Sequence, residues 1–174
     1  DASTNYYCVV SGPCALPINS NFSTLVVNEK VAITSQPQVS QTFCTGNTAT
    51  FSILATGTGL TYQWYKGATP SVDGGSISGA TSPTLSISSL VVGDASNNYY
   101  CIVSGTSPCT NVTSSNAALI VNTFASITIQ PAPTQTICAD LFASFFITAT
   151  GGNLNYQWYK GATMLTNGGP ITGA

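Results

Sequence analysis

Charged residues are scarce in this chain, which has three lysines, five acidic residues and no arginine or histidine among 174 residues. Without a basic surface the chain has little to attract phosphate, so nucleic acid and anionic membranes are poor candidates as partners. The absence of histidine and arginine removes the commonest general base, the commonest transition-metal ligand and the usual anion clamp. The composition therefore predicts that the chain is not an enzyme and binds no cofactor.

Long hydrophobic runs are also lacking. No stretch is apolar over the roughly 20 residues that a membrane-spanning helix needs, so we expect no membrane insertion. Polarity comes instead from Ser, Thr, Asn and Gly, and such a neutral surface suits a protein outside the cell. The six cysteines fit an oxidising compartment better than the cytosol. We therefore expect an extracellular or cell-surface location.

One stretch occurs twice: residues 62–69 (YQWYKGAT) return unchanged as residues 156–163, an offset of 94. Within each copy the side chains alternate, with the tryptophan on one parity and its neighbours on the other. Such alternation predicts a half-buried strand whose indole fills a core between two sheets. Trp64 and Trp158 are therefore expected to be core residues.

The repeat divides the chain into three segments. Residues 1–28 match the end of a repeat and are expected to form the last two strands of a domain. Residues 29–122 form a complete domain, and residues 123–174 repeat the N-terminal part of it. Two explanations for the incomplete ends stay open. Either the chain is a period of a longer array, or neighbouring copies complete the end domains by adding strands to exposed edges.

Short alternating runs separated by Gly, Asn and Pro predict an all-β fold, with about seven strands in the complete domain and no helical periodicity. Residues 48–55 place Phe51 and Ile53 on one face, and residues 85–88 alternate in the same way. An antiparallel sandwich follows from this pattern. Besides the two tryptophans, the expected core residues are Ile53, Leu85, Ile87, Tyr99 and Ile147.

Trp64 on the third strand and the run from Asp94 to Tyr99-x-Cys101 resemble an immunoglobulin-like (Ig-like) domain. The resemblance implies that Tyr99 forms a tyrosine corner, in which its hydroxyl bonds to the backbone of the preceding loop. Many Ig domains have a cysteine on the second strand that bridges to the one on the later strand. Here Ile53 occupies that position, so Cys101 cannot form the usual bridge.

More narrowly, three phrases resemble the tandem Ig-like repeats of large secreted surface proteins and adhesins of Bacteroidetes-type bacteria. They are FCTG from Phe43, ATGTGLTYQWYKG from Ala55 and YYCVVSG from Tyr6. This resemblance implies a chain of tandem Ig-like sandwiches whose end domains are incomplete here.

Each full repeat has three cysteines, so they cannot all pair within one domain. The candidates for closing a small loop around the last turn are Cys8, Cys14, Cys101 and Cys109. Cys44 lies in the first turn, at the opposite end of the sandwich, where it faces the next domain. For Cys44 and its counterpart Cys138 two alternatives stay open: a bond across a domain or chain boundary, or a free buried thiol.

Three tyrosines, Tyr65, Tyr100 and Tyr159, alternate out of phase with the expected core and are candidates for surface contacts with a glycan or a protein. The main prediction is a structural repeat of an adhesin or extracellular filament, with neighbouring copies as its partners. The alternative is a carbohydrate- or protein-binding module that uses the tyrosine-bearing face. Near-identity of the two tryptophan stretches favours the structural repeat, because a dedicated binding site is normally confined to one module.

Overall fold

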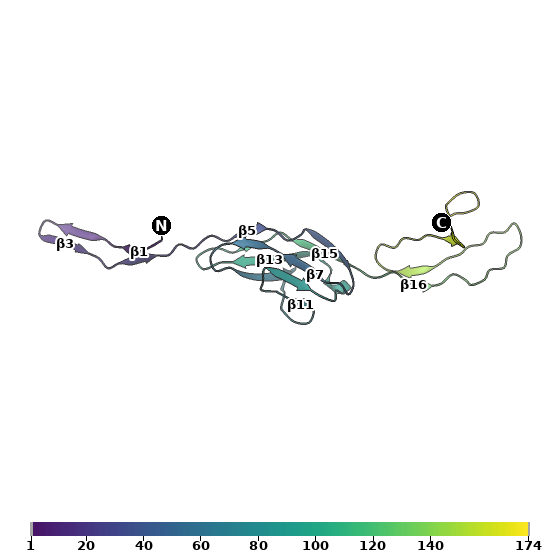
Figure 1. The fold of residues 1–174 in the computed structure, drawn as a ribbon, viewed down its shortest axis with the longest axis horizontal. Coiled ribbons are helices and arrows are strands. Elements are labelled where there is room, and N and C mark those ends of the chain that lie inside the picture. Colours follow the sequence, from purple (N-terminus) through teal and green to yellow (C-terminus); the bar gives the residue numbers. More distant parts are fainter. Residues whose placement is uncertain (1, 174) are drawn as a thin grey trace.

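The computed structural model describes residues 2–173 and consists of three consecutive segments (Figure 1). A closed body in the middle is flanked by an extended hairpin on the N-terminal side and an open, strand-poor segment on the C-terminal side. Residues 1 and 174, the outer limits of the predicted segments, lie outside the described part. Within that part the only helical element is the 3₁₀ turn η1 (Val92–Asp94).

The closed body is a sandwich of two layers. The larger sheet has, in order, β10 (Thr69–Pro70), β9 (Thr61–Lys66), β13 (Ser96–Ser104), β15 (Ala117–Asn122) and β6 (Ser40–Cys44), with β14 (Val112–Thr113) also paired to β13. The other layer has β11 (Ile77–Ser78), β12 (Thr84–Ile87) and β7 (Ala49–Ser52), and a short ladder joins β5 (Ala32–Ser35) to β8 (Leu54–Thr56). The all-β sandwich predicted from the alternating pattern is confirmed, and its two layers agree with the Ig-like fold that the resemblance implies.

One ladder departs from the expected antiparallel arrangement. Strand β6 pairs in parallel with β15, with Ser40 opposite Ala118 and Cys44 opposite Asn122. The chain leaves β5 in one layer, passes the buried Pro37, and enters β6 in the other layer. Proline has no N–H to donate to a ladder, so it suits the crossing point between the layers. Because β6 and β15 then run in the same direction, Cys44 and Asn122 lie together at one end of the sandwich.

The core forms where the inward parities of the two layers meet. On β13 the burial alternates residue by residue, with Tyr99, Cys101 and Val103 inward. Trp64 is 0% exposed, and the ring of Phe51 lies between it and Tyr99, at centroid distances of 6.2 and 4.9 Å. The Trp64 Nε1–H donates a hydrogen bond to Ser82 O at 2.9 Å, so the polar atom of the buried indole is satisfied. The predicted core residues Ile53, Leu85, Ile87 and Tyr99 are all at most 2% exposed.

The flanking segments have strands but no closed core. Before the body, β1 (Ser3–Tyr6) pairs with β4 (Ser23–Leu25), and β2 (Val9–Gly12) pairs with β3 (Ala15–Asn19), which makes one long hairpin. After it, β16 (Ser126–Ile129) pairs with β17 (Thr148–Thr150), and β18 (Tyr159–Lys160) pairs with β19 (Thr163–Met164). The apolar side chains of both flanking segments are largely exposed.

The prediction that Trp158 and Ile147 are core residues is wrong for this chain, because both are only half-buried. Trp158 keeps an aromatic neighbour, Phe145, at 6.4 Å and 46°, close to the 6.2 Å and 40° of Phe51 and Trp64. Trp158 lacks the strands that would pack over its ring. Residues 123–173 correspond to residues 29–79 and contain no counterpart of β12, β13 or β15, the strands that bury Trp64.

Candidate functional site

Two of the three predicted surface tyrosines form a pair on the outer face of the larger sheet. Tyr65 on β9 lies opposite Tyr100 on β13, and their rings stack at 5.1 Å with an angle of 5° between the planes. Both are half-buried, and each ring covers one face of the other. Tyr159 is 59% exposed on the short strand β18, where no neighbouring strand supplies a partner ring. The stacked pair is therefore particular to the closed body.

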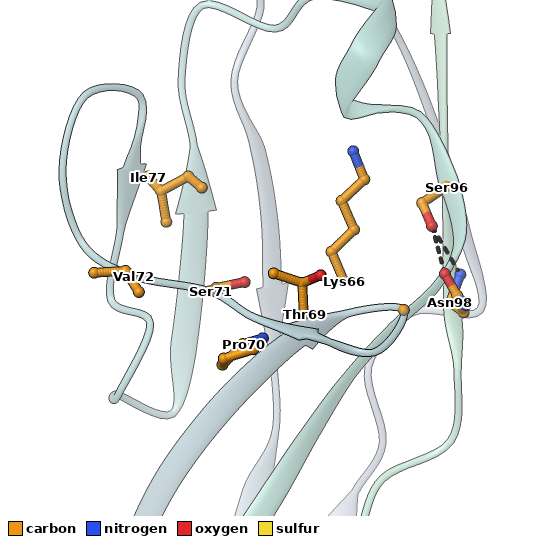
Figure 2. A pocket seen from close by; sticks show the side chains of 9 residues that line it. Lys66, Thr69, Pro70, Ser71, Val72, Ile77, Ser96 and Asn98 are labelled. Atoms are coloured by element: carbon orange, nitrogen blue, oxygen red, sulfur yellow. Dashed lines mark hydrogen bonds between the residues drawn. The ribbon is translucent and has the colours of Figure 1, made fainter.

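A groove of about 600 Å³ lies at the end of this sheet, beside the turn between β9 and β10 (Figure 2). Its lining includes Lys66, Thr69, Pro70, Val72, Ile77 and Asn98. The Lys66 ammonium is committed elsewhere, since Nζ donates to Gly93 O and lies 5.9 Å from the centre of the Tyr99 ring. The groove therefore offers hydroxyl, amide and apolar contacts and no uncommitted positive charge.

Two acidic side chains of the body, those of Asp73 and Asp94, organise turns. Asp73 Oδ1 accepts a hydrogen bond from Ala80 N at 2.7 Å, and Asp94 Oδ2 accepts one from Val91 N at 2.9 Å. Among residues 2–173, no three His, Cys, Asp or Glu side chains come close enough together to hold a metal ion. The part of the chain that the structure describes also contains no helix both long and apolar enough to cross a membrane.

The tyrosine corner implied by the resemblance is present. Tyr99 Oη donates a hydrogen bond to Asp94 O at 2.7 Å, which ties the start of β13 to η1. Burial raises the pKa of Tyr99 to about 12, and the nearby Asp94 carboxylate acts in the same direction. Both effects disfavour the phenolate, so the hydroxyl stays a hydrogen-bond donor well into alkaline solution.

The prediction that Cys8, Cys14, Cys101 and Cys109 close small loops around the last turn is wrong in this structure, where all six cysteines are free. Cys101 shares the inward parity of Tyr99 and is 0% exposed, and burial raises the pKa of its thiol to about 11. Cys109 lies in the loop after β13, outside the core. The two sulfurs have different neighbours: Cys101 Sγ lies 3.6 Å from Ile102 O, whereas Cys109 Sγ lies 3.8 Å from Asn28 O. Cys8 and Cys14 are exposed on the N-terminal hairpin.

Cys109 and Cys44 lie at the two ends of the body, here called poles. Cys109 is at the N-terminal pole, where its Sγ lies 3.8 Å from Asn28 O. Cys44 is at the C-terminal pole, where its Cα pairs with that of Asn122. Cys138, the counterpart of Cys44, is exposed in the C-terminal segment.

The residue that joins one module to the next is held from both sides. On the upstream side, Asn122 ends β15 and its carbonyl accepts a hydrogen bond from Thr45 N at 2.9 Å. On the downstream side, the equivalent Asn28 donates from Nδ2 to Ser107 O at 3.2 Å. Glu29, the next residue, is also fixed, because its N–H donates to Thr58 Oγ1 at 2.9 Å. Residues 27–31 and 121–125 contain neither Gly nor Pro, but nothing in the local sequence identifies these contacts.

Comparison with family models matches residues 32–122, just over half of the chain, to the Ig-like domain described as CHU_C associated. Among solved structures, an I-band fragment of titin is similar with a TM-score of 0.70 at 18% identity, covering 94% of this chain and 57% of that one. A three-Ig fragment of titin with Glu-to-Ala changes has a TM-score of 0.67 at 20% identity, covering 80% of this chain and 50% of that one.

The chain thus spans about half the length of the solved structures that it resembles, and at these identities the likeness shows the fold of consecutive Ig domains alone. Comparison with curated proteins finds no match. The family match agrees with the observed geometry, which includes a tryptophan-centred two-layer core and a tyrosine corner. The chain belongs to the CHU_C-associated Ig-like domain family.

Proposed function

We propose that this chain is a structural segment of a large extracellular bacterial protein, an adhesin or filament built from tandem Ig-like modules, and that it has no enzymatic activity. Ig-like domains are generally non-enzymatic, and this type is typical of secreted and surface proteins. The weakly charged surface is consistent with a building role, because it provides neither an ionic binding patch nor a metal cluster among the described residues.

The observation that carries the proposal is the shared junction residue. Asn122 belongs to the last strand of the body, and its equivalent Asn28 is bonded to the body that follows it. A linker held on both sides leaves no free residues for bending. Successive modules would therefore form a stiff row, as in other one-dimensional repeat proteins. A stiff row suits a stalk or fibre that carries tension or presents a tip.

The test uses the chain extended after residue 174 by a second copy of residues 81–122, here called the completed chain. Because residue 174 corresponds to Ala80, the extension supplies the missing counterparts of β12, β13 and β15 to the last module. Negative-stain electron microscopy should show the two closed bodies in line with a narrow spread of angles. A matched control with a four-residue Gly-Ser insertion after Asn122 should broaden that spread. An equally broad spread without the insertion would contradict the rod.

Neighbouring copies are the partners that we propose for the open segments. Tyr6, Val10, Leu25 and Val27 are between 45% and 64% exposed, whereas their counterparts Tyr99, Val103, Leu119 and Val121 are at most 8% exposed. Completion by further modules of the same polypeptide and strand addition by a neighbouring chain both bury this surface. Light scattering of the 174-residue chain separates them: association that grows with concentration favours strand addition, and a stable monomer favours completion within a longer polypeptide.

The second candidate function is recognition of a carbohydrate or protein by the tyrosine-bearing face. The stacked pair of Tyr65 and Tyr100 next to a neutral groove favours it, since aromatic rings and hydroxyls suit sugar rings and polar protein surfaces. A glycan array with the chain tests this candidate. Selective binding that Tyr100→Ala abolishes and Tyr159→Ala retains would support the recognition role, whereas no selective binding would favour the structural role.

A further inference from the structure

We propose that each junction between consecutive modules is closed by a disulfide between the Cys44 position of one module and the Cys109 position of the next. This inference rests on the proposed tandem array. It assigns a role to Cys44 and Cys109, the two cysteines of the body that lie outside the core. Each junction then has one thiol from the upstream module and one from the downstream module.

The downstream side of a junction is seen at the N-terminal pole of the body. Cys109 is half-buried in the loop that follows β13, and its thiol points at Asn28 O, 3.8 Å away. The loop is anchored there by three further hydrogen bonds, from Cys109 N to Thr106 O, from Thr106 N to Thr58 O, and from Asn28 Nδ2 to Ser107 O. The thiol is therefore fixed against the junction residue rather than free in solvent.

The upstream side is seen at the C-terminal pole. Cys44 is the last residue of β6 and lies opposite Asn122 in the parallel ladder. The next residue donates a hydrogen bond from Thr45 N to Asn122 O at 2.9 Å. Asn122 is the equivalent of Asn28, one repeat later. The carbonyl oxygen of the junction residue is therefore the atom that both cysteine-bearing segments approach.

The start of the next module repeats part of the backbone arrangement at the N-terminal pole of the body. Thr58 N donates to Glu29 O at 3.3 Å, and the equivalent Gly152 N donates to Thr123 O at 3.1 Å. An added Cβ on Gly57 would meet Leu60, Val31 and Lys30, and one on the equivalent Gly151 would meet Leu154, Ala125 and Phe124, which are the equivalent residues. The loop carrying the next Cys109 therefore has part of the same backbone support beside Asn122. Two positions differ: Gly152 lacks the hydroxyl of Thr58, and Asn153 replaces Gly59, where an added Cβ would meet the Thr106 side chain.

If the Cys44–Thr45 segment of one module and the Cys109 loop of the next both contact the carbonyl oxygen of the junction residue, the distance between them is limited. Contacts of 2.9 and 3.8 Å to the same oxygen cannot separate Thr45 N from the incoming sulfur by more than about 6.7 Å. Thr45 N is bonded to the backbone carbonyl carbon of Cys44. The Cα atoms of the two cysteines then lie within about 12 Å of each other, a range that includes the roughly 4.4–6.8 Å over which a disulfide joins two Cα atoms.

Other pairings of these cysteines are unfavourable. Cys44 and Cys109 of one body lie at opposite poles, and Cys101 is sealed in the core at 0% exposure. Bond formation removes one proton and one electron from each of the two thiols. The electrons pass to a small-molecule or protein disulfide by thiol–disulfide exchange, which reduces that disulfide to two thiols. An oxidising extracellular compartment sustains such an acceptor.

The experiment uses the completed chain with Cys8→Ser and Cys14→Ser, so that the exposed hairpin thiols are absent. The protein is incubated with oxidised glutathione, alkylated and digested with trypsin, which cuts after Lys30, Lys66 and Lys160. Peptide 31–66 then contains Cys44 as its only cysteine. We expect loss of the Cys44 thiol and a link from peptide 31–66 to the peptide that begins at Gly161 and contains the appended copy.

Two controls assign the link within that peptide. Replacing the appended copy of Cys109 by Ser should abolish it, and replacing the appended copy of Cys101 by Ser should leave it intact. Recovery of Cys44 as an alkylated thiol, as a glutathione adduct or in a link to peptide 67–160 would overturn the inference.

Quenching of Trp158 fluorescence by acrylamide separates this failure from failure of the array. A protected Trp158 with an unlinked Cys44 overturns the disulfide alone. A Trp158 that stays accessible shows that the last module has not closed, and that result overturns both proposals.

Discussion

Removal of the Tyr99 hydroxyl tests whether the tyrosine corner stabilises the body. Tyr99→Phe leaves the ring in place, stacked on Phe51 at 4.9 Å and 21°, and deletes only the hydrogen bond to Asp94 O at 2.7 Å. The Asp94 carbonyl then loses the partner that holds η1 against β13. We expect the free energy of unfolding to fall by about 1–2 kcal/mol, the cost of one buried hydrogen bond whose acceptor is left partly unsatisfied.

The assay is equilibrium unfolding in urea, followed by tryptophan fluorescence in a Trp158→Phe background so that Trp64 is the only reporter. For a body of this size, each kcal/mol should lower the melting temperature by about 4–8 °C. An unchanged slope with a lower midpoint would show that stability changed and the unfolded state did not.

Tyr65→Phe is the matched control. It removes the same atom from a half-buried ring whose hydroxyl makes no hydrogen bond to the described residues, so its effect should stay within about 0.5 kcal/mol. If Tyr99→Phe is no more destabilising than Tyr65→Phe, the corner is a geometric coincidence and the reasoning from its bond length is refuted.

Three further predictions follow from burial. The pKa of Cys101 in the folded state is raised from 9.0 to about 11, and that of Tyr99 from 10.0 to about 12. The free energy of unfolding should therefore keep its full value below pH 9 and fall as pH rises through 11 and 12, and urea midpoints from pH 8 to 12 should show this fall. Cys101→Val should lack the part of the fall that comes from the thiol, at the lower pH. Leu85→Ala, at a side chain 0% exposed, should cost about 2–5 kcal/mol in urea unfolding, whereas Leu54→Ala, at 65% exposure, should cost less than about 0.5 kcal/mol; equal costs would contradict the assigned core. In a chain that retains Trp158 as its single tryptophan, acrylamide should quench the fluorescence readily, and the completed chain should be protected; protection in both would show that the last segment closes by itself.

The features that sequence reasoning predicted are those that period-two alternation determines locally. Inward parity on each strand identified Trp64, Ile53 and Leu85, because a strand with one buried face repeats its apolar positions every two residues. The same rule could have placed Cys101 in the core, since it shares the parity of Tyr99. The loop-closing pair was predicted instead from proximity in the sequence, which takes no account of the direction of a side chain.

Two other features depended on contacts distant in the sequence. The parallel ladder between β6 and β15 joins segments about 80 residues apart, and nothing in the local pattern of either strand specifies the direction of its partner. The junction contacts of Asn28 and Asn122 depend on loops from two different modules. Local alternation contains no information about either feature.

The two identical stretches show the same limit most directly and have a consequence for folding. Residues 62–66 belong to the six-residue strand β9 next to β13, whereas the same five residues at 156–160 contribute only Tyr159 and Lys160 to the two-residue strand β18. Because the difference lies in the partner strand and not in the stretch itself, a module gains its tryptophan-centred core only when its last strands arrive. Such non-local pairing folds slowly and leaves apolar surface exposed meanwhile, as at Phe142 and Phe146, which are 97% and 63% exposed. Each module of an array made from the N-terminus would therefore stay open until its final 30 or so residues emerge. A preceding closed module with a fixed junction gives those residues a defined edge on which to close.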